Sequence, residues 1–313
     1  MNKSTPRDLT QRLGLVVPQK WIPFSKDNIN GPTVVEYRVP IFSNYKFYLM
    51  YFGHHKGKYI RVAWSFSPTG PFKRVPIARP LLIWNVFGER KGHVASPEVQ
   101  KFGSKTYLFS HSPSRYFEPG KQITYMSRLW LGIFCSGAKP IALQPYARFF
   151  SLNGSVHAIT NGADVIKFDP DSLEASPISV DKSPLLVPDL IDSVKSVRHA
   201  QIVESMGFVL CFFTRVGDAP ERILVSKLEA KRSDEAKFSE PIELLRPTED
   251  YEGAGQKIEP SKNGISRQSE NALRDPFVAK FGNQHFLYYS TAGEKGIACA
   301  KLDMENLCAV LNS

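Results

Sequence analysis

The 313-residue chain has few cysteines and no long apolar segment. Its four cysteines, Cys135, Cys211, Cys299 and Cys308, lack the Cys-x-x-Cys spacing of metal-binding and redox motifs, so we expect reduced, buried thiols. No run approaches the length that crosses a membrane, and residues 1–19 lack the apolar core of an ordinary secretory signal. We therefore expect a soluble, cytoplasmic protein.

Dense clusters of one charge are also missing. Lys and Arg number 40 against 30 for Asp and Glu, a net charge of +10, which should attract anions such as acidic sugars or phosphates. The positive residues are spread thinly and form no nucleic-acid motif, so a solvated basic surface is favoured and no nucleic-acid partner is expected. Cofactor motifs are absent, and His54, His55, His93 and His199 lack a metal-ligand spacing. We expect neither cofactor nor metal.

What the chain does have is a repeated strand pattern. Pro or Asp-Pro precedes a short apolar run, a Gly-centred turn and an aromatic strand, most clearly at 95–110 and 274–290. Aromatic and β-branched runs, separated by Gly, Pro, Asn and Ser, fill most of the rest, whereas helical signals are scarce. About five copies of such a unit predict an all-β, five-bladed β-propeller.

The copies also suggest a domain organisation. Blades are expected to begin near residues 31, 95, 146, 197 and 273. We interpret 30–313 as a single propeller domain and 1–29 as an N-terminal extension that packs on it. The segment 244–271 interrupts the rhythm, and since long loops are often functional, we expect it to cross the funnel mouth.

Several motifs carry a family resemblance over about residues 30–302. They are Gly53-His54-His55-Lys56-Gly57-Lys58-Tyr59-Ile60-Arg61, Gly92-His93-Val94-Ala95-Ser96-Pro97-Glu98-Val99, Val197-Arg198-His199, the segment 215–224, and Leu273-Arg274-Asp275-Pro276. They resemble the five-bladed propeller glycosidases, the superfamily of arabinanases, β-xylosidases, invertases and levansucrases, and within it an uncharacterised bacterial subgroup. The resemblance implies a carbohydrate site in the central funnel.

The resemblance also implies catalytic candidates. Arabinanase-type members use a base, a tuning acid and a general acid, and Glu98 matches the tuning acid. The other two carboxylates are missing. The base position in blade one reads Asn30-Gly31-Pro32, and the acid position in blade four reads Arg198-His199-Ala200. Asp275 resembles the Arg-Asp-Pro aspartate of invertase-like relatives, which binds sugar hydroxyls and stabilises the transition state. We therefore expect Glu98, Asp275 and His199 to be catalytic, with a loop carboxylate as another possible base.

Further residues are candidates for substrate binding. They are His54, His55, Lys56, Arg61, His93, Arg198 and Arg274. The His54-His55-Lys56 segment either recognises sugar or forms a polar hairpin tip. Arg198 and Arg274 suit a uronic acid substrate or an ion pair with Glu98 equally. Between the second and third strands of blade four, Asp218 is expected in a structural turn and Glu221 in a salt bridge or rim contact.

Together these features favour a glycoside hydrolase that acts on a small or terminal, possibly anionic, glycoside by carboxylate and histidine acid-base chemistry. Two alternatives stay open. One is a lyase-like sugar-modifying enzyme, in which His199 or a tyrosine removes the proton α to a uronate carboxylate. The other is a carbohydrate-binding propeller without catalysis.

Overall fold

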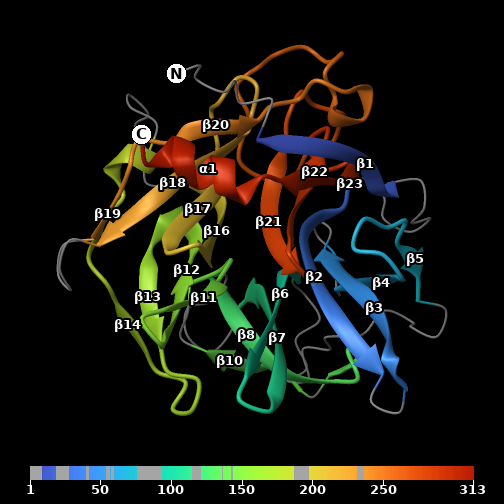
Figure 1. Ribbon diagram of the computed structural model, residues 1–313, viewed down its shortest axis with the longest axis vertical. Helices are drawn as coiled ribbons and strands as arrows, with labels where there is room; N and C mark the ends of the chain where they lie inside the picture. The colour runs from blue at the N-terminus through green and yellow to red at the C-terminus, as the bar shows by residue number, and fades with distance from the viewer. Residues whose placement is uncertain are drawn as a thin grey trace.

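The structure is a computed structural model. It describes residues 9–18, 28–39, 42–53, 57, 60–75, 94–114, 121–135, 137–141, 144–186, 197–230 and 236–313. These residues form five β-sheets arranged around a central axis, which confirms the expected all-β, five-bladed propeller (Figure 1). The candidates His54, His55, Lys56 and His93 lie outside the described residues.

The first three blades follow one another along the chain. The first contains β2 (Asn30–Val39), β3 (Phe42–Gly53), β4 (Arg61–Ser65) and β5 (Lys73–Arg74). The second contains β6 (Ala95–Phe102), β7 (Lys105–Pro113), β8 (Gln122–Trp130) and β10 (Lys139–Ile141), with β9 (Phe134–Cys135) beside β8. The third contains β11 (Arg148–Leu152), β12 (Ser155–Ile159), β13 (Val165–Phe168) and β14 (Ala175–Pro177).

The last two blades are more elaborate. The fourth contains β16 (Val197–Ser205), β17 (Phe208–Arg215) and β18 (Ile223–Ala230), with β19 (Ala236–Phe238) and β20 (Ile242–Leu245) on β18 and β15 (Val180–Asp181) parallel to β19. The fifth contains β21 (Arg274–Phe281), β22 (Gln284–Thr291), β23 (Gly296–Leu302) and β1 (Thr10–Pro18), and α1 (Met304–Leu311) follows β23.

The fifth blade joins the two ends of the chain. Antiparallel pairing places Thr10 of β1 opposite Leu302 of β23 and Pro18 opposite Gly296. The segment expected as an N-terminal extension therefore supplies the outer strand of the last blade. A domain boundary at residue 30 stays a prediction.

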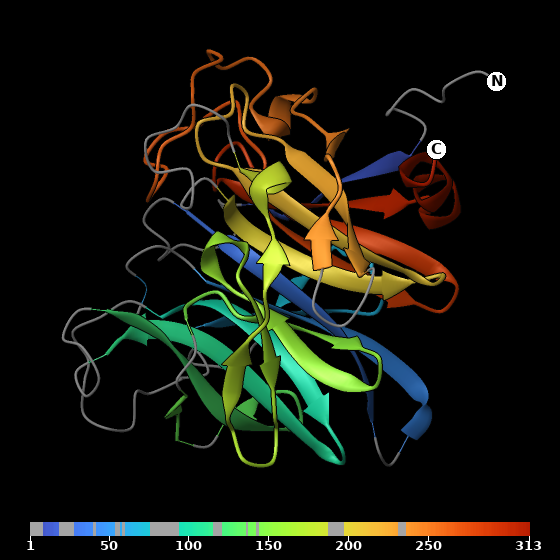
Figure 2. The same ribbon diagram turned by 90° about the vertical axis from the view of Figure 1, so that its left-hand side faces the viewer.

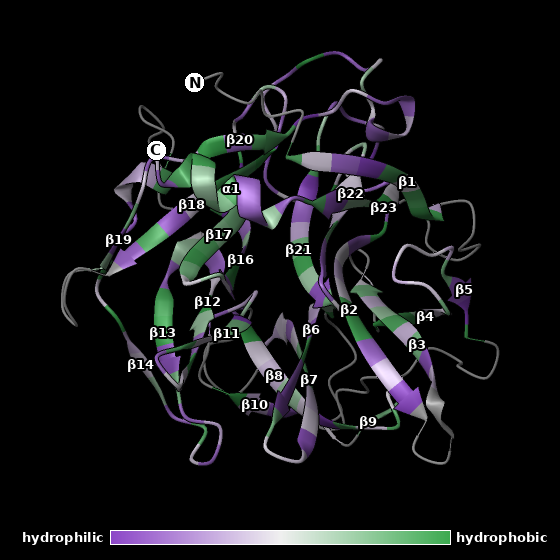
Figure 3. Cartoon of the chain, viewed as in Figure 1, coloured by the Kyte–Doolittle hydropathy of each residue, from purple (hydrophilic) through white to green (hydrophobic). Residues whose placement is uncertain are grey.

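The apolar core is divided among the interfaces between blades. Each of five buried clusters joins one pair of neighbouring sheets; for example, Tyr51 of β3 and Leu108 of β7 belong to the cluster between blades one and two. Successive side chains of a strand point to opposite faces, so continuous apolar runs such as 210–213 of β17 supply both neighbouring clusters (Figure 3). All four cysteines are free, and burial raises the pKa of Cys135 and Cys299 to about 12.

The innermost strands are β2, β6, β11, β16 and β21, which neighbour one another around the axis (Figure 1). The long segment between β20 and β21 lies at one end of the propeller (Figure 2). Within the described ranges, no helix combines the length and apolarity needed to span a bilayer.

Candidate functional site

The same backbone feature recurs where the innermost strands begin. Gly31, Ser96 and Asp275 all have positive φ angles, of 61°, 48° and 53°, and each directly precedes a proline. The strand register shifts at these points, and β16 has a shift of the same extent between Val197 and Ala200. A left-handed conformation is costly for serine and aspartate, so the fold imposes these bends. They bring the starts of the strands together at one end of the axis, which we call the mouth.

Asp275 joins three blades at the mouth. Its Oδ2 atom accepts hydrogen bonds from the backbone N–H of Gly31, at 3.2 Å, and from Ser290 Oγ, at 2.8 Å. Its Oδ1 atom contacts Nδ1 of His199. The side chain of Asp275 is 1% exposed and that of His199 is 20% exposed, so the carboxylate is enclosed while the imidazole reaches the surface.

This pair has the arrangement of an oriented acid-base group. A carboxylate at Nδ1 favours the tautomer with its proton there, stabilises the imidazolium form and leaves Nε2 to exchange a proton. The structure therefore brings together two of the expected catalytic residues, Asp275 and His199, from different blades. The structure also gives Gly31 a role. Gly31 stands before the proline of blade one as Asp275 does in blade five, and its backbone N–H donates a hydrogen bond to the Asp275 carboxylate.

Two aromatic rings extend the site beyond the pair. The ring of Tyr146 lies 4.3 Å from that of His199 and 4.2 Å from that of His111, measured between centroids. Tyr146 has a φ of 63°, which is unusual for a bulky residue. Burial raises the pKa of its phenol, while Arg198 opposes and Glu294 adds to the rise. The Tyr146 hydroxyl therefore stays protonated at neutral pH.

A buried charge network lies under the mouth on blades four and five. Arg198 Nε is 2.7 Å from Glu221 Oε1, and Arg274 Nε is 2.9 Å from Glu221 Oε2. Thr214 Oγ1 donates a further hydrogen bond to Glu221 at 3.0 Å. Burial favours a higher pKa for the Glu221 carboxyl, but Arg198 and then Arg274 reverse this, and the pKa is lowered. Glu221 is thus an ionised carboxylate held between two guanidinium groups.

The network gives both arginines carboxylate partners, and their expected role in substrate binding stays a prediction. Arg274 is buried, and its other nitrogens face Glu270, at 2.5 Å, and Glu294, at 3.6 Å. Arg198 also donates to the carbonyl oxygen of Lys262, at 2.6 Å. Of the two roles that were left open for these arginines, the ion pair with Glu98 is wrong, because Glu98 pairs with Arg148. Arg198 and Arg274 instead pair with Glu221, six residues after β17 ends. Of the acidic side chains in this network, Glu270 is the most open, at 37% exposed.

The segment between β20 and β21 is anchored to blades four and five. Glu252 is buried and accepts hydrogen bonds from Arg12 Nε, at 2.9 Å, and Tyr289 Oη, at 2.7 Å. Farther along, the backbone of Ser261 exchanges hydrogen bonds with Gly217 and Asp218 in the turn before β18. The segment therefore borders the mouth on these two blades and delivers Glu270 to it.

Glu98 has a different set of side-chain partners from Asp275 and His199. It is 1% exposed, and its Oε2 atom is 2.5 Å from Arg148 Nη1, while its Oε1 atom accepts a hydrogen bond from Gln100 at 2.7 Å. The Arg148 guanidinium also bonds Thr33 and the Pro97 carbonyl oxygen, so strands β2, β6 and β11 are tied together near the axis. These contacts show how Glu98 is held within the protein and do not test whether it acts in catalysis. Its catalytic role therefore stays a prediction.

This arrangement predicts a stability effect. Changing Glu98 to Gln leaves the Arg148 charge buried without its carboxylate, which typically costs about 3 kcal/mol of unfolding free energy. The double change Glu98→Gln with Arg148→Met should recover part of the loss, because no unpaired charge remains. Urea unfolding of the three proteins measures this. A double variant less stable than the sum of the single changes would contradict an ion pair here.

The other candidates and the missed residues complete the site. Arg61 begins β4, two strands out from the axis, and its backbone pairs with Phe52 of β3. Its role in substrate binding stays a prediction. The sequence analysis did not single out Tyr146 or His111, and it covered Glu270 only as one of the loop carboxylates. A signal for Tyr146 was available: it stands two residues before Arg148 of β11, just as Asp275 stands two residues before Phe277 of β21, and both have a positive φ. Among the described residues, no three His, Cys, Asp or Glu side chains come together to hold a metal ion.

Comparisons with known proteins agree with this fold. The GH43_1 enzyme from Xanthomonas citri complexed with xylose is similar in structure, with a TM-score of 0.56, 9% identity, and coverage of 94% of this chain and 90% of that one. An exo-1,5-α-L-arabinanase from a bovine ruminal metagenomic library has a TM-score of 0.55 at 9% identity, covering 88% and 92%. An α-L-arabinanase from Cellvibrio cellulosa has 0.52 at 12%, covering 91% and 98%.

These likenesses show that the chain has the five-bladed propeller fold of the GH43 arabinanases and xylosidases, which is the fold of a class of glycoside hydrolases. No family model matches the sequence. An uncharacterized protein of Acanthamoeba polyphaga mimivirus is 27% identical over 304 residues, which span 88% of this chain and 83% of that protein. This relative is viral, so the comparisons do not support the expected bacterial subgroup.

Proposed function

We propose that this protein is a glycoside hydrolase whose acid-base residue is His199, oriented by Asp275. The observation that carries the proposal is the contact between Oδ1 of Asp275 and Nδ1 of His199 at the mouth of a propeller with a glycosidase fold. Fold alone would support no activity, so the argument depends on this pair. The substrate proposed is a small or terminal glycoside, possibly anionic.

The reaction would be acid-base cleavage. Nε2 of His199 would donate a proton to the glycosidic oxygen as its bond to the anomeric carbon breaks, with Asp275 stabilising the imidazolium beforehand. A water molecule would attack the anomeric carbon and lose its proton to a carboxylate, for which the partly exposed Glu270 is the candidate. Transfer of that proton back to His199 would restore both groups.

A second candidate is a lyase-like reaction on a uronate. The Tyr146 ring next to His199, with its hydroxyl protonated, favours it, because one group could remove the proton α to the carboxylate while the other protonates the leaving oxygen. A uronate carboxylate would then need a cation, and Arg198 is already paired with Glu221. We rank this reaction below hydrolysis for that reason.

The test is turnover of a panel of aryl glycosides and uronate oligosaccharides, with products identified by mass and by ultraviolet absorbance. Hydrolysis by the wild type that is lost in His199→Ala supports the proposal. An unsaturated product would favour the lyase. His157→Gln is the matched control, because His157 is a partly buried histidine stacked on Phe150 in blade three. Binding without any product would indicate a carbohydrate-binding propeller.

Tyr146 provides a prediction about positioning. Tyr146→Phe keeps the ring beside His199 and should retain activity within about threefold, whereas Tyr146→Ala removes the ring contact and should lower kcat about tenfold or more. Steady-state kinetics on the best substrate of the panel measures the difference. Equal losses in both variants would instead assign the effect to the hydroxyl.

A further inference from the structure

Asp275 lies at an irregularity in the strand pairing of the fifth blade. The register of β21 with β22 shifts between Arg274 and Phe277. Asp275 and Pro276 therefore stand together opposite a single residue of β22. Such a bulge interrupts the ladder of hydrogen bonds and redirects a side chain, so strand pairing alone does not fix the direction of the Asp275 carboxylate. Its side-chain contacts must do so.

Ser290 of β22 supplies one of those contacts. Its Oγ atom donates a 2.8 Å hydrogen bond to Oδ2 of Asp275, and the backbone N–H of Gly31 donates to the same oxygen at 3.2 Å. Both donors therefore act on Oδ2, while Oδ1 contacts Nδ1 of His199. Ser290 is 0% exposed, so water has no access to replace its hydroxyl. With Oδ2 held from blades one and five, Oδ1 is directed at the imidazole.

The propeller itself does not require a serine at this place. Ser290 stands opposite the residue that precedes the register shift, and the same place is taken by Gly53 in blade one, His111 in blade two and Arg215 in blade four. These three residues share neither size nor chemistry, so the backbone pairing accepts very different side chains. A buried hydroxyl is costly without a hydrogen-bond partner, and here the Asp275 carboxylate is that partner. The serine therefore matches Asp275 rather than the repeat.

We propose that Ser290 is a positioning residue, which acts through Asp275 to set the orientation and the tautomer of the His199 imidazole. A carboxylate oxygen held against Nδ1 favours the tautomer with its proton on that nitrogen. Without the serine hydroxyl, Oδ2 retains the Gly31 N–H alone, so the carboxylate can turn and both tautomers become populated. The effect on the imidazole is independent of the enzyme class, whereas the effect on turnover rests on the proposed glycoside hydrolase function.

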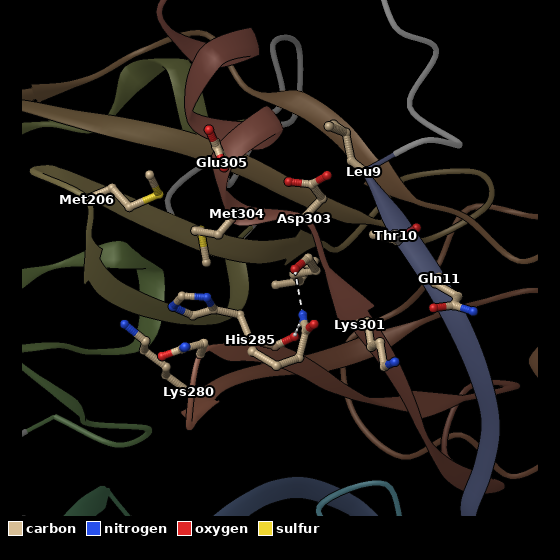
Figure 4. Close-up of a pocket in the computed structure, with 13 residues that line it drawn as sticks. Leu9, Thr10, Gln11, Met206, Lys280, His285, Lys301, Asp303, Met304 and Glu305 are labelled. Carbon is tan, nitrogen blue, oxygen red and sulfur yellow. Dashed lines mark hydrogen bonds between the residues drawn. The ribbon is translucent and has the colours of Figure 1, made fainter.

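A second pair of serine and histidine lies at the opposite end of β22 and offers an internal comparison. His285 Nε2 is 3.4 Å from Ser205 Oγ, and both residues are buried. His285 lines a cavity of about 630 Å³ beside α1, together with Lys280 and Met304 (Figure 4). Within the ranges that the structure describes, no ion pair joins His285 to a carboxylate. This histidine therefore has a serine neighbour without an intervening aspartate.

The first test is NMR of the imidazole nitrogens, with the seven histidines isotopically labelled and the signals assigned by His199→Ala and His285→Gln. Above the pH at which His199 becomes neutral, wild type should show a protonated Nδ1 and an unprotonated Nε2. Ser290→Ala should move the chemical shifts of both His199 nitrogens toward the average of the two tautomers and leave His285 unchanged. Ser205→Ala is the matched control, and it should affect His285 without affecting His199.

The second test is steady-state kinetics on a glycoside that wild type turns over. Ser290→Ala should lower kcat about tenfold and leave KM within about twofold, because the hydrogen bond acts on the acid-base group and not on the bound sugar. Ser290→Cys carries a weak S–H donor and should fall between serine and alanine. A packing role would instead lower the unfolding midpoint and leave kcat unchanged. Ser205→Ala should keep the wild-type kcat.

The two tests separate this proposal from the proposed function. Unchanged His199 nitrogen shifts in folded Ser290→Ala, or a wild-type His199 protonated on Nε2, would overturn the positioning role. Ser290→Cys carries the same test if the alanine variant does not fold. No turnover by wild type would contradict the glycoside hydrolase, yet the NMR result would still decide on Ser290. Shifts that change while kcat does not would keep Ser290 as the positioning residue and remove His199 from the acid-base role.

Discussion

Asp275→Asn should lower kcat about a thousandfold while leaving the fold intact. An asparagine amide can present N–H groups to Nδ1 of His199, which favours the wrong imidazole tautomer and removes the charge that stabilises the imidazolium. Asparagine also tolerates the left-handed backbone at this position, where φ is 53°, so the bend before Pro276 should survive. Steady-state kinetics with circular dichroism and thermal unfolding measures both effects.

The control for this change is Asp218→Asn. Asp218 is also a largely buried aspartate near the mouth, but it faces Arg222, at 3.6 Å, instead of His199. Its replacement should alter kcat little. If Asp275→Asn keeps wild-type activity on a substrate that the protein turns over, His199 is not the oriented acid-base group, and the proposed mechanism fails even though the enzyme class stands.

Glu221→Gln should be the most destabilising single change in the charge network. The carboxylate is fully buried between Arg198 and Arg274. Its removal leaves two guanidinium groups close together with less negative charge to offset their positive charges. Breaking a buried ion pair on one side costs about 3 to 5 kcal/mol, a large fraction of the stability of a typical domain. Urea unfolding should show a clearly lower midpoint. Glu259→Gln, in an exposed pair with Lys257, should leave the midpoint unchanged.

The same network predicts how stability responds to acid. The pKa of Glu221 is lower in the folded state than its ordinary value of 4.5. Its contribution is therefore fully present above about pH 4.5 and is lost as the pH falls toward the folded-state pKa. Unfolding free energies measured from neutral to acidic pH should fall less steeply in Glu221→Gln than in wild type. Parallel curves would contradict the lowered pKa.

Much of the fold was predictable from local sequence. Repeated apolar strands, Gly-centred turns and Pro-marked strand starts occur within short windows, and these windows specify the blades. Asp275 and His199 were likewise recognisable one at a time, because each follows a strand-start motif. Pairing was less predictable: Glu98 pairs with Arg148 instead of Arg198 or Arg274, and those two share Glu221, which the sequence allowed only as a salt bridge or rim contact.

The sequence by itself determined the all-β class and the number of blades, and it placed Asp275 and His199 at strand starts. Tertiary structure alone decided that β1 closes the fifth blade, that Asp275 reaches His199 across a blade boundary and that the Tyr146 ring lies against that of His199. Strand and turn propensities act over a few neighbouring residues. Asp275 and His199 lie on different blades and are 275 − 199 = 76 residues apart in the chain, so only closure of the ring brings their side chains together.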